Sequence, residues 1–142
     1  MIDTEDKPYC IIDILPERVP SDSPGRYFEV ERYFRSHLDE IIRKFASFLN
    51  KLNCYCELEV SLDCETFSGE FAPEDLERFL LETNASPNPL YIRVNSSDAL
   101  FAYAGDEHYL TLYEPDKELL RLVRLLAQAE GLFVWSPCYD IP

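Results

Sequence analysis

The spacing of apolar residues changes along the chain and predicts an alternation of strands and helices. A nearly continuous apolar run at residues 9–15 is typical of a strand inside a sheet, and Asp13 is its one charged residue. Apolar positions at steps of three and four from Tyr27 to Leu52 predict one helix of about seven turns. Residues 54–63 then alternate between apolar and polar, which predicts a strand with one wet face.

The second half of the chain predicts a short helix, a three-stranded meander, a further helix and a last strand. Pro73 and Pro115 are expected to begin the two helices, because proline is favoured in the first helical turn. Gly131 is placed to end the second of them in the left-handed conformation. The strands are expected at residues 90–94, 99–104, 108–113 and 132–135.

The resulting order, β-α-β-α-β-β-β-α-β, predicts a single α+β domain covering residues 1–142. We expect one mixed, largely antiparallel sheet with three helices packed on it. Residues 16–25 contain three prolines and are expected to form a stiff loop, since each proline fixes its own φ and restricts the preceding residue. Residues 1–8 are expected to be a mobile N-terminus.

The cysteines and the apolar runs favour a reduced, cytoplasmic protein. Five cysteines are an odd number, no secretion signal precedes them, and no apolar run is long enough to cross a bilayer. The Cys54-Tyr55-Cys56 sequence lacks the usual two-residue gap and the further ligands of a zinc site, so we expect small buried apolar side chains there. We expect neither a metal nor a cofactor.

Acidic residues dominate the charge, which is −14 overall. Residues 53–118 contain fifteen acids and three bases, a net charge of −12, whereas residues 26–52 carry +2. A polyanion is repelled before contact, so we expect no nucleic acid and no anionic membrane as a partner.

Glu57, Glu59 and Asp63 are expected on one face of the wet strand, and they are the first candidates for binding a partner. Like charges this close repel one another unless a partner supplies bases. The alternative explanation for the row is solubility and protection of a sheet edge.

The meander adds aromatic candidates. If Leu90, Ile92 and Val94 face the core, one face of the meander is aliphatic and the other is rich in tyrosine and phenylalanine. We expect this second face either to be covered by the Pro-rich loop or the tail after Trp135, or to supply interface anchors. The aromatic candidates are Tyr91, Tyr103, Tyr109 and Tyr113.

These observations leave three hypotheses open. We find no catalytic motif, so the first is a non-catalytic module that binds a basic protein, as small acidic inhibitors and immunity-type proteins do. The alternative is a small-molecule site or weak enzyme between the sheet and the Pro-rich loop, using Asp13, His108 and tyrosines. The third is a homodimer formed through the long helix or an edge strand of the meander.

Overall fold

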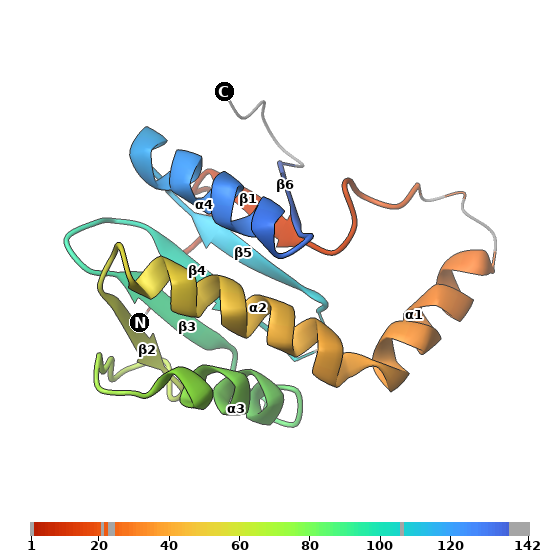
Figure 1. Cartoon of the computed structure of the whole chain (residues 1–142), viewed down its shortest axis with the longest axis horizontal. Coiled ribbons are helices and arrows are strands. Elements are labelled where there is room, and N and C mark those ends of the chain that lie inside the picture. The colour runs from red at the N-terminus through yellow and green to blue at the C-terminus, as the bar shows by residue number, and fades with distance from the viewer. Residues whose placement is uncertain (1, 21, 23–24, 106, 137–142) are drawn as a thin grey trace.

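The described helices and strands form one sheet with helices packed against it (Figure 1). The computed structural model describes residues 2–20, 22, 25–105 and 107–136, so parts of the Pro-rich loop lie outside it, as do Asp106, Pro137 and Cys138. The elements are β1 (Tyr9–Asp13), α1 (Arg26–Ser36), α2 (Leu38–Asn53), β2 (Leu58–Ser61), α3 (Pro73–Thr83), β3 (Leu90–Val94), β4 (Leu100–Tyr103), β5 (Tyr109–Tyr113), α4 (Lys117–Ala129) and β6 (Phe133–Trp135).

The sheet has the strand order β2-β3-β4-β5-β1-β6, and every neighbouring pair is antiparallel. Short turns join β3, β4 and β5 as a meander, which was predicted. β1 comes first in the sequence but lies between β5 and β6, opposite Tyr109–Tyr113 on one side and Phe133–Trp135 on the other. The α+β class is confirmed, and the order of elements differs from the expected one by a single additional helix.

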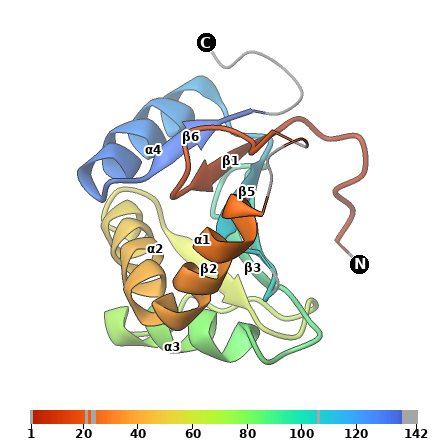
Figure 2. The same cartoon turned by 90° about the vertical axis from the view of Figure 1, so that its right-hand side faces the viewer.

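One face of the sheet carries the core. Figures 1 and 2 place α2 and α4 over this face, with α3 beside α2, and Figure 2 places the N-terminal segment on the opposite side of the sheet. α2 buries seven side chains against the sheet, and the rings of Phe45 and Phe48 contact Tyr103 and Phe101 of β4. Burial of this apolar surface is the main favourable contribution to folding.

The expected long helix is wrong in one respect, because it is two helices that meet at His37. The Ser36 hydroxyl donates to the backbone carbonyl oxygens of Arg32 and Tyr33. The His37 Nδ1 lies 2.8 Å from the same carbonyl oxygen of Tyr33, within hydrogen-bond distance. Side chains that bond to nearby carbonyls compete with the helical backbone. Figure 1 shows α2 lying along the sheet and α1 projecting away from it. None of the side chains of α1 is buried.

The wet strand is shorter than expected. The expected strand was residues 54–63, but α2 extends to Asn53 and only Leu58–Ser61 form β2. The Asn53 side chain accepts the Leu58 N–H at 3.0 Å, so the chain turns here before the strand begins. The expectation that both cysteines of this segment are buried is also wrong, because Cys54 is exposed and Cys56 is half-buried.

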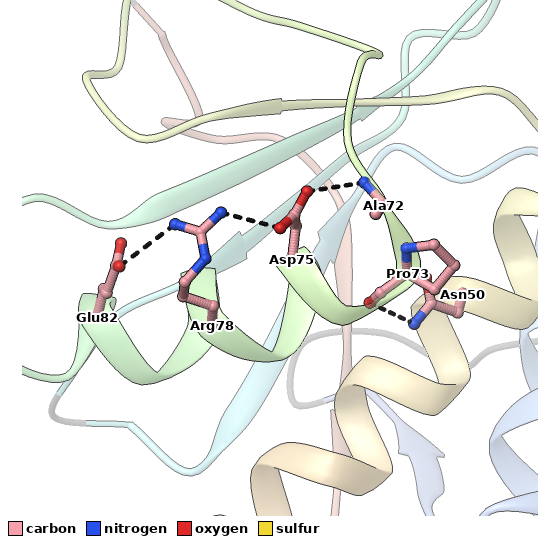
Figure 3. A network of polar contacts seen from close by, with 6 residues as sticks. All are labelled: Asn50, Ala72, Pro73, Asp75, Arg78 and Glu82. Carbon is pink, nitrogen blue, oxygen red and sulfur yellow. Dashed lines mark hydrogen bonds and ion pairs between the residues drawn. The ribbon is translucent and has the colours of Figure 1, made fainter.

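Polar contacts fix the start of α3, which begins at Pro73 as predicted (Figure 3). Asp75 accepts the N–H of Ala72 at 2.8 Å and pairs with Arg78 at 2.9 Å. These two contacts lower the pKa of Asp75. Asn50 of α2 donates to the carbonyl oxygen of Pro73 at 3.0 Å, which ties the two helices together.

α4 is less covered than its sequence suggested. Asp116 caps its first turn by accepting the Leu119 N–H at 2.8 Å, and Gly131 follows its end with φ +76°, as expected. Apolar residues at positions 119, 120, 122, 123, 125, 126, 127 and 129 occupy most of the circumference of this helix, a pattern that predicts a helix buried on most sides. Leu125, however, is 54% exposed, because only one side of the helix faces the sheet.

Candidate ligand-binding groove

A groove with a volume of about 1260 Å³ is lined by residues of β1 and β5 that alternate with the core residues of these strands, so it lies on the face of the sheet opposite the core helices. Its floor is formed by outward-facing residues of β1 and β5. Its walls are formed by three segments: the N-terminal residues 4–8, the first part of the Pro-rich loop at 14–20, and α1. We call this the outer groove. It is large enough for an ordinary small ligand.

Aromatic rings line much of the outer groove. Tyr9 and Tyr113 lie opposite each other in the β1–β5 register, and their ring centroids are 5.8 Å apart. Trp135 adds an indole from β6, and Tyr27 and Phe28 add rings from α1. The strand order makes β5, β1 and β6 neighbours, and α1 adds its two rings from outside the sheet.

Asp13 is the buried acid of the outer groove. It ends β1 opposite Tyr109, and only 6% of its surface is exposed. Burial raises the pKa of its carboxyl to about 6, although the Ile14 N–H opposes this by donating to Oδ1 at 2.7 Å. No base pairs with this carboxyl among the described residues.

His108 lines the same groove, so the two residues of the small-molecule hypothesis lie on one site. Its Nδ1 is buried and has no hydrogen-bond partner among the described residues. Burial lowers the pKa of the imidazole, while the nearby Glu31 opposes that shift. The lowered pKa favours the neutral imidazole, in which Nδ1 either accepts or donates one hydrogen bond.

Two further polar groups complete this end of the groove. The Trp135 Nε1 is buried without a hydrogen bond of standard geometry within the described chain, although the indole slightly lowers the pKa of Asp13. Tyr27 lies near Glu31 on α1, and burial followed by that carboxylate raises the pKa of the phenol. Buried polar groups of this kind are uncommon unless they serve a purpose.

The predicted acidic residues are engaged within the chain. Glu59 forms an ion pair with Arg93 at 2.9 Å, which lowers the pKa of Glu59, and Glu57 accepts from Asn95 at 3.0 Å. Arg93 also lies over the ring of Phe67, 4.5 Å from its centroid. The exposed row of unpaired charge that the strand pattern suggested is therefore partly balanced from within the sheet.

Asp63 lies beyond the end of β2 rather than on its face. It accepts the N–H groups of Thr66 and Glu65 at 2.8 and 2.9 Å, and the Ser61 hydroxyl at 3.1 Å. The two backbone bonds lower the pKa of Asp63 to about 2. Its observed contacts are those of a residue that stabilises a turn.

Three of the four predicted tyrosines share the outward face of the sheet: Tyr91, Tyr109 and Tyr113 are half-buried there. Tyr103 is wrong as a surface candidate, because it is 1% exposed and contacts Phe45 in the core. The alternation along β4 identified two faces correctly, but the larger side chains pack against the helices.

Sequence reasoning missed several residues of the outer groove. Tyr9 and Trp135 face outward at alternate positions of their strands, and period-two spacing was the available signal for both. Tyr27 and Glu31 were assigned to the single long helix. Nothing in their spacing indicated that this part would form a separate helix, α1, and line the groove.

Compared with protein-family models, curated proteins and solved structures, the chain has no significant match, so the functional argument depends on the site itself. Within the described ranges, no three His, Cys, Asp or Glu side chains gather in an arrangement that would hold a metal ion. None of the described helices has the length and apolar character needed to cross a bilayer.

Proposed function

We propose that the protein is a ligand-binding protein whose site is the outer groove. The observation that carries the proposal is a groove of about 1260 Å³ whose lining combines aromatic rings with a buried carboxyl, that of Asp13, and a buried imidazole nitrogen, that of His108. Large grooves with a few converging polar groups are the usual form of a ligand site.

Binding without catalysis fits the residues of the groove. Among its described lining residues there is neither a serine nor a cysteine that a base would activate. Asp13 and His108 are the two groups with shifted pKa values suited to proton transfer, so a weak enzyme remains the alternative form of this proposal.

The test uses the one tryptophan of the chain, Trp135, which lines the outer groove. Its fluorescence is measured while a library of small polar and aromatic compounds is added. Saturable changes that disappear in Tyr113→Ala, but persist in a control variant at the exposed Tyr55, would support the proposal. Changes that persist equally in both variants would contradict it.

A second candidate function is the capture of a basic protein by the acidic side of the sheet. It is supported by the outward-facing Tyr91, which lies close enough to Tyr113 for the two phenols to interact, and by the charge of −14. Reversing the charge of Glu57 and Glu59 should weaken capture of a basic partner purified from the source cell. Unchanged affinity would remove the acidic strand from this function.

A further inference from the structure

We propose that the outer groove binds an organic cation, an ammonium or a guanidinium group held between aromatic rings and the carboxylate of Asp13. This inference rests on the proposed function, because it names the class of ligand for that same site. Three independent features of the groove support it: its rings, its charge balance and the unpaired state of its buried acid.

The rings supply faces for a cation. The rings nearest to Asp13 are those of Trp135, whose indole interacts with the carboxyl, and Tyr27, whose phenol interacts with it electrostatically. Tyr109 lies opposite Asp13 in the β1–β5 register and lines the same groove. The face of an aromatic ring attracts a cation through its quadrupole, most strongly for tryptophan and when water is excluded. Several rings from different strands form the kind of site that recognises quaternary ammonium groups.

The charges of the groove favour a cation over an anion. Its described lining contains five carboxyl residues and two bases: Asp6, Asp13, Glu17, Glu31 and Glu107 against Lys7 and Arg18. Lys7 is already paired with Glu114 at 3.8 Å, and Glu31 with Arg35 at 3.1 Å. An anion entering this groove would meet net repulsion.

Asp13 is the acid that lacks a counter-charge. It is 6% exposed, and the contacts that stabilise its carboxylate are backbone N–H groups and the indole of Trp135 rather than a base. A buried charge without a partner is costly, and an arriving cation would offset that cost. A neutral ligand would leave the carboxylate unpaired.

His108 fits the same ligand. With its proton on Nε2, the buried Nδ1 would accept a hydrogen bond from the N–H of a primary ammonium or a guanidinium, as in agmatine or lysine, whereas choline has no N–H to donate. Nδ1 has no partner among the described residues, so this bond would give the buried nitrogen the hydrogen bond that it lacks.

The experiment compares cations with a neutral compound of the same shape. Choline, agmatine, a short lysine-containing peptide and 3,3-dimethyl-1-butanol, the neutral isostere of choline, are titrated while Trp135 fluorescence is recorded. We expect saturable binding of a cation and affinity for the neutral isostere weaker by about tenfold. Binding of the free cations assigns a small molecule, whereas binding of the peptide alone assigns a side chain of a protein.

Two variants identify the residues responsible. Asp13→Asn should weaken cation binding by about tenfold and leave the neutral isostere unaffected, because only the charge is removed. Glu59→Gln is the matched control: it removes a carboxylate from the same face of the sheet but outside the groove, and it should leave the affinity unchanged.

The pH dependence adds a second readout. A proton competes with the cation for the Asp13 carboxylate, so affinity should fall by about tenfold between pH 7 and pH 5. Among the other titratable groups, Tyr27 of α1 interacts electrostatically with this carboxyl and Tyr109 of β5 lies opposite it in the register. Glu31 and His108 line the same groove. The dependence should disappear in Asp13→Asn and persist in His108→Gln.

The outcomes separate this inference from the proposed function. Equal binding of choline and its neutral isostere, with no effect of Asp13→Asn, would overturn the cation inference and leave a groove that binds ligands. No response to any of the four probes would also overturn the inference, while the compound library tests the groove independently.

Discussion

Replacing Asp13 by asparagine should stabilise the protein at neutral pH, because it removes a charge from a buried position. The substitution keeps Oδ1 as the acceptor of the Ile14 N–H, which lies at 2.7 Å. Burial raises the pKa of this carboxyl from an ordinary 3.8 to about 6, a difference equivalent to about 3 kcal/mol. The asparagine amide must be buried in its place, and this cost reduces the expected gain to about 2 kcal/mol.

The sign of the effect follows from the direction of the pKa shift. An acid whose pKa rises on folding favours the folded state below its unfolded pKa, and this contribution is lost as the pH rises through the folded pKa. The gain from Asp13→Asn should therefore be complete above about pH 7, fall to about half at pH 5 and approach zero below about pH 3.

Urea unfolding followed by circular dichroism measures this gain at pH 7.5 and pH 5. Both pH values lie above the sequence pI of 4.4, so they avoid the pH at which the protein carries no net charge and associates most strongly. Asp63→Asn is the matched control with the opposite sign. Backbone hydrogen bonds lower the pKa of Asp63 to about 2, so its ionised form stabilises the fold at neutral pH and the variant should lose stability. A gain from Asp13→Asn that is absent at pH 7.5, or equal at both pH values, would refute the reasoning.

The remaining predictions concern the core, the thiols and one turn. Tyr103→Ala should lower the free energy of unfolding, measured with urea, by about 3–5 kcal/mol, and Tyr91→Ala should lower it by under about 1 kcal/mol, because only the ring of Tyr103 is in the core. Similar losses in the two variants would contradict the placement of β4. Iodoacetamide should label Cys54 in the folded protein and Cys10 only after unfolding, as read by peptide mass spectrometry. Cys10 is buried, and burial raises the pKa of its thiol to about 12. Labelling of Cys10 in the folded protein would contradict this prediction. Gly105→Ala should lower the melting temperature, because the added Cβ would lie 2.5 Å from a carbonyl oxygen at the end of α3, and an unchanged value would argue against that approach.

Local periodicity was sufficient to predict most of the elements. The step of three and four between Ile41 and Leu52 reflects the one face of α2 that meets the sheet, and alternation in β3 placed Leu90, Ile92 and Val94 in the core. These patterns exist because each element buries one side, so its apolar residues recur at the spacing of a helix or a strand.

Periodicity does not reveal which side of a strand the helices cover, or where a helix bends. Phe101 and Tyr103 face the helices because their rings pack against Phe48 and Phe45 of α2. These partners lie more than fifty residues earlier in the sequence. The bend at His37 depends on side-chain bonds to backbone carbonyls, which leave the apolar spacing unchanged.

The outer groove required the strand order as well as the pattern. Its residues come from the chain start, α1, β5 and β6, and they meet because β1 lies between β5 and β6. The clearest signal in the sequence was Asp13, a charge inside an apolar run, which a buried site explains.

The most direct test of the central claim is the choline titration followed by two-dimensional ¹⁵N NMR of the whole chain. We predict that the backbone amides of Asp13, Tyr109 and Trp135 shift together along one saturation curve. Shifts confined to the strand that carries Glu57 and Glu59, or no saturable shift at all, would contradict a cation site in the outer groove.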